Sequence, residues 1–357
     1  MLRFLRGRLR PMLLRSKRHL GFDGGTSSNW LDGVFCEPRS GSNRARHEQR
    51  EMPYRLYLPA GVGHSDRVPL IVMLHGCTQS ALTFSEGTRM NTVAEDEHCA
   101  VLYPEQSKKS NFLRCWNWFD PDCLAGGGEP GLIVRTLDHV IKHHPIDQTR
   151  VYVTGFSAGG AMAAALCATH GHLFAACAIH SGVMFHAASA PQQAIRVLHS
   201  GSTESPEDIA RKVADRRDPG AAFVPTLVIQ GADDRTVSPV NAEQIVQQLR
   251  LLAELVQSED GPVKPQSERL LESGGRQYRQ QDYAQGARTL IRSILVDGLG
   301  HAWSGGDARH TFFDSAGPDA SRLIIEFLMQ YRLANAPETM ESDQSPPAAA
   351  ASRSSAR

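Results

Sequence analysis

The sequence has no net charge, no long apolar run and no internal repeat. Its 38 Lys and Arg residues balance 38 Asp and Glu residues, so the overall charge gives no reason to expect nucleic acid or a membrane surface as the main partner. No stretch is apolar over the length needed to span a bilayer. A chain of 357 residues with a hydrophobic fraction of 41% is, however, long and apolar enough to bury a sizeable core. We therefore expect a globular protein.

Cysteine is also scarce. Seven cysteines are an odd number, in a chain too long to need the disulfide framework of a small secreted domain. Cys99, Cys167 and Cys177 lie within apolar runs, as reduced core cysteines do. Cysteine usage by itself leaves the redox compartment open.

The two ends of the chain differ in composition from its middle. Residues 1–50 are rich in Arg, Ser, Gly and Asn and their first twenty include seven basic residues and no acid, which predicts a basic leader that is disordered or loosely attached. The arginines interrupt the apolar run that a secretory signal requires. The Ala-, Ser- and Pro-rich residues 334–357 predict a disordered tail. Residues 51–333 are expected to form one domain, in which 186–222 is interpreted as an insertion.

Within this domain, apolar strand patterns alternate with helical patterns. Strands are predicted at 52–58, 69–76, 100–103, 151–154, 177–180, 225–231 and 288–296. Helices are predicted at 85–97, 131–143, 161–167, 241–256 and 320–331, and exposed or irregular loops at 107–130 and 257–275. Short buried strands that alternate with helices predict an α/β fold with a mostly parallel sheet covered by helices on both faces.

One stretch carries the strongest chemical signal. The strand predicted at 151–154 runs into Gly155–Gly159, which fits the pattern G-x-S-x-G, and a helix of small residues follows at once. This order of strand, sharp turn and helix is the context of a nucleophile elbow, in which the glycines allow a tight turn and the serine is exposed at its tip. The pattern predicts that Ser157 is a nucleophile.

A serine hydroxyl needs a base, and the base needs an orienting acid. In this kind of sheet both follow the serine, the acid first, on loops beyond the C-terminal ends of strands. The loop after the strand at 225–231 offers Asp233 and Asp234; Asp233 could instead cap or brace the turn, and Asp234 is preferred only weakly. The loop after the strand at 288–296 offers His301 as the base.

Acyl transfer also needs backbone N–H groups that bind the oxyanion. One is expected from Ala158, which follows the nucleophile, and the second from Cys77, in the loop after the strand at 69–76. His75 is a rival base, but it precedes the serine in the chain, and we predict a structural role for it in the loop.

Several motifs, in order along the chain, resemble those of the esterase family of polyhydroxybutyrate (PHB) depolymerases. They are Leu74–Cys77, Tyr103–Ser107, Cys115–Phe119, Gly155–Gly159, Gly298–Gly306 and Gly317–Ser321. The resemblance spans roughly residues 50–331 and implies the α/β-hydrolase fold and hydrolysis of carboxylic esters. The mechanism that it implies calls for no cofactor and no metal.

The resemblance also implies roles for particular residues. The family motif G-x-x-D-x-x-V matches Gly231 to Val237 and favours Asp234 as the acid. The family further implies a disulfide between Cys77 and Cys115, which would hold the oxyanion loop. Three tryptophans are then expected to line an apolar groove that binds the substrate: Trp116, Trp118 and Trp303.

The predicted function is therefore a serine esterase that acts on short-chain polyhydroxyalkanoates or their oligomers. Feruloyl and acetylxylan esterases share much of the motif pattern and are the alternative substrate classes. Hydrolysis of amides by the same residues is a further alternative, and a catalytically inactive, polymer-binding hydrolase scaffold is an alternative of another class. The resemblance suggests an extracellular or periplasmic protein, whereas the leader without a signal pattern suggests the cytoplasm. The sequence leaves the oligomeric state open.

Overall fold

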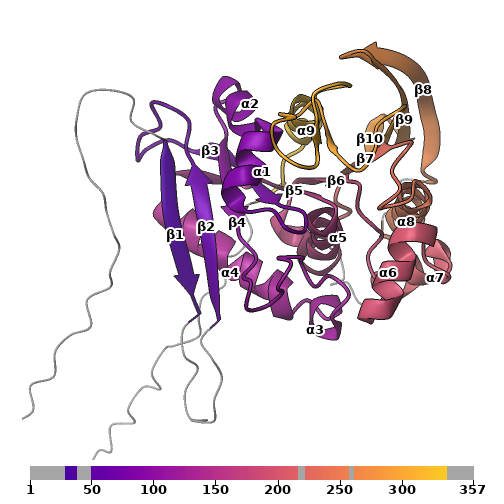
Figure 1. The fold of residues 1–357 in the computed structure, drawn as a ribbon, viewed down its shortest axis with the longest axis horizontal. Coiled ribbons are helices and arrows are strands. Elements are labelled where there is room, and N and C mark those ends of the chain that lie inside the picture. Colours follow the sequence, from indigo (N-terminus) through magenta and orange to yellow (C-terminus); the bar gives the residue numbers. More distant parts are fainter. Residues whose placement is uncertain (1–28, 38–49, 216–221, 257–260, 336–357) are drawn as a thin grey trace, which may run out of the picture.

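The computed structural model describes residues 29–37, 50–215, 222–256 and 261–335. These residues form a ten-stranded sheet with helices on both faces, together with a short two-stranded sheet (Figure 1). Residues 1–28 and 38–49 of the predicted leader and 336–357 of the predicted tail lie outside the described residues.

Six parallel strands form the centre of the large sheet. In spatial order they are β4 (Ala100–Pro104), β3 (Val68–Leu74), β5 (Ile146–Phe156), β6 (Ala176–His180), β7 (Thr226–Gly231) and β10 (Arg288–Val296). Antiparallel strands extend both edges: β2 (Glu51–Tyr57) and β1 (Trp30–Cys36) beyond β4, and β9 (Arg276–Gln285) and β8 (Lys264–Ser273) beyond β10. Because the central strands are parallel, the loops after β3, β5, β7 and β10 all leave the sheet at the same edge.

Helices bury both faces of this sheet, as β3 illustrates. Leu70 and Val72 belong to a core with α4 (Gly128–His143), α5 (Ala158–His170) and α8 (Val240–Val256), whereas Ile71 and Met73 belong to a core with α1 (Ala81–Thr88), α2 (Met90–Asp96) and α9 (Ala320–Leu328). Figure 1 shows these two sets of helices on opposite sides of the sheet. The remaining short elements are α3 (Pro121–Leu124), α6 (Pro191–Ser200), the 3₁₀ helix Gly171–Leu173, α7 (Pro206–Ala214), β11 (Trp303–Ser304) and β12 (Phe313–Asp314).

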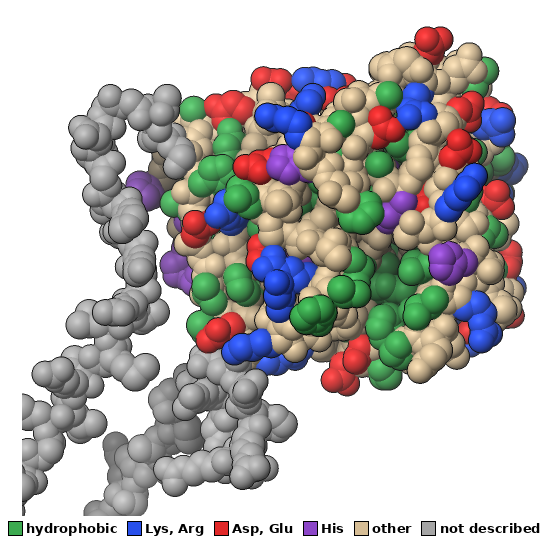
Figure 2. Space-filling view, viewed as in Figure 1, with side chains coloured by type: hydrophobic (Ala, Val, Ile, Leu, Met, Phe, Trp, Pro, Cys, Tyr) green, Lys and Arg blue, Asp and Glu red, His purple; other side chains and the backbone are tan. Residues whose placement is uncertain are grey.

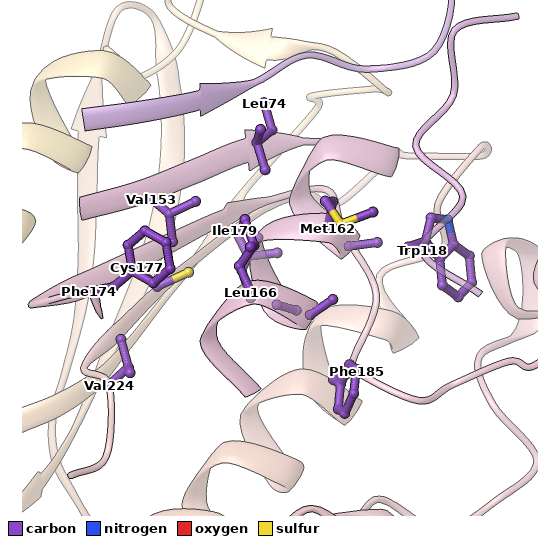
Figure 3. Packing of buried hydrophobic residues seen from close by; sticks show 14 of the residues in the cluster. Leu74, Trp118, Val153, Met162, Leu166, Phe174, Cys177, Ile179, Phe185 and Val224 are labelled. Carbon is purple, nitrogen blue, oxygen red and sulfur yellow. The ribbon is translucent and has the colours of Figure 1, made fainter. Parts of the chain in front are cut away.

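Helix α5 is the element closest to the middle of the sheet. It is built largely of alanine and glycine, so little side-chain bulk separates its axis from β5 and β6. Its larger side chains, Met162 and Leu166, are fully buried and lie near Val153 and Ile179 of these strands (Figure 3). Burial of a side chain such as Leu166 contributes about 2 kcal/mol. This packing fixes the N-terminus of α5, where Ser157 lies.

Two edge strands differ from the sequence prediction. The prediction places 30–36 in the leader, but these residues form β1, which pairs along its length with β2. The prediction of a loop over 257–275 is also wrong, because 264–273 form β8; residues 257–260 lie outside the described residues. Both strands are exposed at most positions and therefore lack the alternating apolar pattern from which strands are predicted.

The other predicted elements differ in smaller ways. The predicted helix at 85–97 is two helices, α1 and α2, which meet at Arg89 in a left-handed conformation (φ 54°). The predicted insertion at 186–222 contains α6 and α7, which pack beside α8; residues 216–221 lie outside the described residues. In the described part of the chain, no helix has the length and apolar character of a membrane span.

On the face shown in Figure 2, acidic and basic side chains are interspersed over most of the surface. Hydrophobic side chains gather around a hollow in the lower central part of this face. The mixed distribution agrees with the equal numbers of acidic and basic residues in the sequence.

Candidate active site

Ser157 lies at the sharp turn between β5 and α5. Its backbone has φ 57° and ψ −120°, a strained conformation that costs about 1–3 kcal/mol. The glycines on either side are required by close contacts: a Cβ atom at Gly159 would lie 2.0 Å from the carbonyl oxygen of Leu74, and one at Gly155 would lie 2.2 Å from the carbonyl oxygen of Gly159. The packing of the helix start against β3 and β5 therefore holds the serine at the tip of a sharp strand–turn–helix, which is the geometry predicted for a nucleophile elbow.

A continuous chain of hydrogen bonds joins Ser157, His301 and Asp234. The Nε2 atom of His301 lies 3.0 Å from Oγ of Ser157, and its Nδ1 atom lies 2.8 Å from Oδ2 of Asp234. The three residues are far apart in the sequence and follow β5, β10 and β7; β7 and β10 are neighbours in the parallel sheet, and β6 separates β7 from β5. Ser157 and His301 remain partly exposed, whereas Asp234 is buried.

The loop after β7 makes Asp234 an acceptor of several hydrogen bonds. Its Oδ1 accepts from the backbone N–H groups of Thr236 and Val237 at 2.9 and 2.8 Å, and its Oδ2 also accepts from Nε2 of Gln230 at 3.2 Å. Burial raises the pKa of the Asp234 carboxyl, but the hydrogen bond from His301 and those from the two backbone groups outweigh it, so this pKa lies below its usual value. The carboxyl group is therefore ionised at neutral pH.

The neighbouring Asp233 lies outside this arrangement. Its side chain is exposed, and its backbone N–H donates to the carbonyl oxygen of Leu299, which ties the loop after β7 to the loop that carries His301. The geometry therefore favours Asp234 over Asp233, in agreement with the family motif.

Two buried histidines near Ser157 form hydrogen bonds with backbone groups of the surrounding loops. His75 donates from Nδ1 to the carbonyl oxygen of Gly76 and accepts at Nε2 from the backbone N–H of Gln106. His180 accepts from the backbone N–H of Ser304, and its ring stacks on Trp303. Burial lowers the pKa of His75 to about 4 and, together with the nearby His301, that of His180 to about 3, so both are neutral at pH 7. His75 thus has the predicted role in its loop.

The two predicted oxyanion donors belong to segments that touch each other. Ala158 begins α5, and Cys77 follows β3, against whose last carbonyl groups Gly159 packs. In the described part of the chain, neither backbone N–H group donates to a protein acceptor. Thr78, beside Cys77, has a positive φ of 65°, as Ser157, beside Ala158, has a positive φ of 57°, so a strained residue adjoins each of the two N–H groups.

A disulfide joins Cys77 to Cys115, as the resemblance implies. The backbone N–H of Thr78 also donates to the carbonyl oxygen of Leu113 at 2.6 Å, so the loop before Cys115 is bound to the loop that carries Cys77 at two neighbouring points. The remaining five cysteines form no disulfide.

The prediction that three tryptophans line a substrate groove is wrong. Trp116 and Trp303 are fully buried and Trp118 is 5% exposed. The indole N–H of Trp116 donates to the carbonyl oxygen of His75, and that of Trp303 donates to Oγ of Ser321. Trp118 belongs to the same core cluster as Met162 of α5 (Figure 3). In the sequence, a tryptophan in an irregular segment suggests an exposed ring that could bind substrate. In the structure, each of the three rings is packed in the core.

Other apolar side chains are exposed beside His301 and beside the loop that carries Cys77, and no pattern in the sequence indicates them. Phe312 is 37% exposed, has a left-handed backbone (φ 71°) and lies with its ring 6.0 Å from the imidazole of His301. Phe112 and Leu113 are 83% and 54% exposed, in the loop bound to Thr78. A single exposed aromatic in a loop has no periodic pattern around it, so only the tertiary structure identifies it.

Known proteins resemble this chain in sequence and in fold. Poly(3-hydroxyalkanoate) depolymerase C of Paucimonas lemoignei is 31% identical over 249 residues, which are 69% of this chain and 57% of that protein. Feruloyl esterase B of Thermothelomyces thermophilus is 28% identical over 243 residues, which are 65% of this chain and 78% of that protein. Among solved structures, an acetyl xylan esterase from Aspergillus awamori superposes with a TM-score of 0.59 at 20% identity, covering 75% of this chain and 94% of that one.

These comparisons agree with the architecture. The solved structure shows the same α/β-hydrolase fold. The chain spans little more than half of the length of the depolymerase. The family model described as esterase PHB depolymerase matches residues 52–262, more than half of the chain. The chain therefore belongs to the esterase PHB depolymerase family.

Proposed function

We propose that this protein is a serine esterase in which Ser157, His301 and Asp234 act as nucleophile, general base and orienting acid. The single observation that carries the proposal is the hydrogen-bonded chain from Asp234 through His301 to Ser157, with distances of 2.8 and 3.0 Å. This is the arrangement that activates a serine hydroxyl, which is otherwise a weak nucleophile.

The reaction proceeds in two steps. His301 accepts the proton of Ser157 as its oxygen attacks the ester carbonyl, and Asp234 stabilises the imidazolium that forms. The N–H groups of Ala158 and Cys77 bind the tetrahedral oxyanion. The alcohol then leaves with the proton from His301, and water releases the acid from the acyl-enzyme by the same route. Removal of one oxyanion donor in such a site costs about 10²- to 10³-fold in kcat.

The proposed substrates are short-chain polyhydroxyalkanoates or their oligomers. The sequence similarity to a poly(3-hydroxyalkanoate) depolymerase supports this class. The partly exposed Ser157, with Phe312 beside His301 and with Phe112 and Leu113 beside the oxyanion loop, supports it as well, because a polyester chain is apolar between its ester groups and needs an accessible site. Feruloyl esters are the second candidate, which the similarity to a feruloyl esterase over 78% of that protein supports.

The nucleophile is tested with Ser157→Ala. We expect the variant to lose hydrolysis of p-nitrophenyl butyrate and labelling by a fluorophosphonate probe, while Ser181→Ala, at the serine that follows the neighbouring strand β6, keeps its labelling. Hydrolysis by Ser157→Ala at the wild-type rate would falsify the nucleophile assignment. A wild-type protein that the probe leaves unmodified would favour the inactive, polymer-binding alternative.

The substrate class is tested with a panel of esters. Initial rates are compared on PHB granules, oligomers of 3-hydroxybutyrate, methyl ferulate and acetylated xylan, and on a p-nitrophenyl ester beside its matched anilide. The proposal requires the highest kcat/KM on the hydroxyalkanoate substrates. Faster turnover of methyl ferulate would replace it with the second candidate, and equal turnover of the anilide would exclude a dedicated esterase.

A further inference from the structure

A buried carboxylate lies in the first turn of α4, away from Ser157. Glu129 is 7% exposed, and its carboxylate accepts three hydrogen bonds from amide groups: from Nε2 of Gln106 at 2.5 Å, from Nδ2 of Asn117 at 2.6 Å and from the backbone N–H of Asn117 at 2.7 Å. Burial of a carboxylate costs several kcal/mol unless such bonds offset it. The proposed mechanism gives this residue no role.

The partners of Glu129 connect it to the loop that contains Cys77. The side chain of Gln106 also donates to the carbonyl oxygen of Cys115, and its backbone N–H donates to Nε2 of His75 at 3.1 Å. The segment that Glu129 binds at Asn117 also carries Trp116, whose indole N–H donates to the carbonyl oxygen of His75 at 3.0 Å. Gln106, a partner of Glu129, therefore holds the ring of His75. Trp116, which is adjacent to the other partner Asn117, holds the carbonyl group of His75.

His75 in turn sets the direction of one peptide group. Its Nδ1 donates to the carbonyl oxygen of Gly76 at 2.8 Å. The carbonyl of Gly76 and the N–H of Cys77 belong to the same planar peptide unit and point in opposite directions. Fixing this carbonyl therefore fixes the direction in which the Cys77 N–H points. The disulfide to Cys115 restrains only the side chain of Cys77, so it leaves the rotation of this peptide group to the hydrogen-bond network.

We propose that Glu129 is a positioning residue for the oxyanion site, which acts through Gln106 and His75 to orient the N–H group of Cys77. This inference rests on the proposed function, since it requires that Cys77 donates to the oxyanion. Glu129 touches neither the substrate nor the reacting atoms; its buried carboxylate binds Gln106 and Asn117, and so holds both ends of the segment 106–117 against the start of α4.

Glu129→Gln tests the proposal, because it keeps the shape of the side chain and replaces one acceptor oxygen with an NH₂ group. Whichever way this amide is turned, its NH₂ group faces an N–H donor of Gln106 or Asn117. We expect kcat on p-nitrophenyl butyrate to fall by about tenfold or more while KM changes by less than about threefold, because the interaction that is lost is made in the transition state. Glu129→Asp, which keeps the charge and both oxygens, should recover part of the loss.

A second readout separates orientation from general stability. A trifluoromethyl ketone forms a tetrahedral adduct with an oxyanion, so its Ki should rise by the same factor as kcat/KM falls across Glu129→Gln, Glu129→Asp and Gln106→Met. Gln106→Met also keeps the proposal testable if Glu129→Gln does not fold. Glu254→Gln is the matched control: Glu254, on α8, accepts from the backbone N–H of Val263 at 3.0 Å and lies outside this network, so its removal should leave kcat and Ki unchanged.

Two results would overturn the positioning role. One is a folded Glu129→Gln protein whose kcat lies within about twofold of wild type, where a positioning role requires a larger loss. The other is an unchanged Ki for the trifluoromethyl ketone beside a lowered kcat. A wild-type protein that neither hydrolyses the ester nor binds the ketone would instead remove the proposed function itself, so the two failures are distinguishable.

Discussion

Asp234→Asn is the substitution for which the structure makes the sharpest prediction. Asp234 accepts hydrogen bonds at Oδ1 from the backbone N–H groups of Thr236 and Val237, and at Oδ2 from Gln230 and His301. An asparagine has only one oxygen, so its NH₂ group takes the place of one of the two carboxylate oxygens.

The two orientations of the asparagine differ in cost. An NH₂ group at the position of Oδ1 leaves the buried N–H groups of Thr236 and Val237 facing a donor, at about 1–3 kcal/mol each. An NH₂ group at the position of Oδ2 faces the side-chain amide of Gln230 and the imidazole of His301. The imidazole can relieve its own conflict, because its proton can move from Nδ1 to Nε2. The second orientation costs less, and in it the N–H of His301 points at Ser157 and cannot accept its proton.

We therefore expect kcat to fall by about 10⁴-fold, the loss typical of a triad histidine in the wrong tautomer. This loss corresponds to about 5 kcal/mol of transition-state stabilisation. The assay is steady-state hydrolysis of p-nitrophenyl butyrate, with circular dichroism to check the fold. Asp233→Asn, at the exposed neighbour, is the control and should stay within about twofold of wild type. An Asp234→Asn protein with more than a tenth of the wild-type kcat would refute the reasoning, as would a large loss in the control.

Three further predictions concern stability. Cys115→Ala opens the loop that the disulfide to Cys77 closes over 38 residues, and urea unfolding should show a loss of up to about 4 kcal/mol. His75 and His180 have pKa values lowered to about 4 and about 3, so the unfolded chain binds their protons first as the pH falls below about 6.5. The stability that the two neutral histidines contribute should therefore be fully present above about pH 6.5. As the pH is lowered from there, the free energy of unfolding should decrease by about 1.4 kcal/mol per pH unit for each histidine. Gly159→Ala places a Cβ atom 2.0 Å from a backbone carbonyl oxygen of β3 and should destabilise the protein by about 3 kcal/mol or more.

Each of these predictions has a matched control in the chain. Cys36→Ala removes an exposed free thiol and should leave the urea midpoint unchanged, and His64→Gln removes an exposed histidine and should leave the pH profile unchanged. Gly300→Ala adds a methyl group where no atom lies within 4 Å of it and should be tolerated. An oxidised protein should expose five titratable thiols on unfolding; seven would contradict the disulfide. A flat stability profile between pH 6.5 and 4, or a Gly159→Ala protein as stable as Gly300→Ala, would contradict the other two predictions.

Much of the fold follows from local patterns in the sequence. Strands buried on both faces, such as β3 and β7, are continuous apolar runs, and the alternation of such runs with amphipathic helices leads to the parallel sheet. The edge strands β1 and β8 were missed because their side chains face solvent at most positions, so pairing with a neighbouring strand is what makes them strands. The backbone hydrogen bonds of β1 and β8 are made to the neighbouring strands β2 and β9, which the local sequence pattern of each edge strand does not include.

The sequence by itself determined the sharp turn between strand and helix at Ser157 and the order in which a serine, an acid and a histidine follow the strands. These features depend on neighbours along the chain, where a tight turn requires glycine and a buried strand requires apolar residues. The tertiary structure alone decided that the side chain of Asp234 meets the imidazole of His301, that the tryptophans fill the core, and that Glu129 binds both Gln106 and Asn117. These outcomes depend on which distant atoms meet when the sheet and helices pack, and the physical reason is that burial and hydrogen-bond partners are properties of the assembled fold.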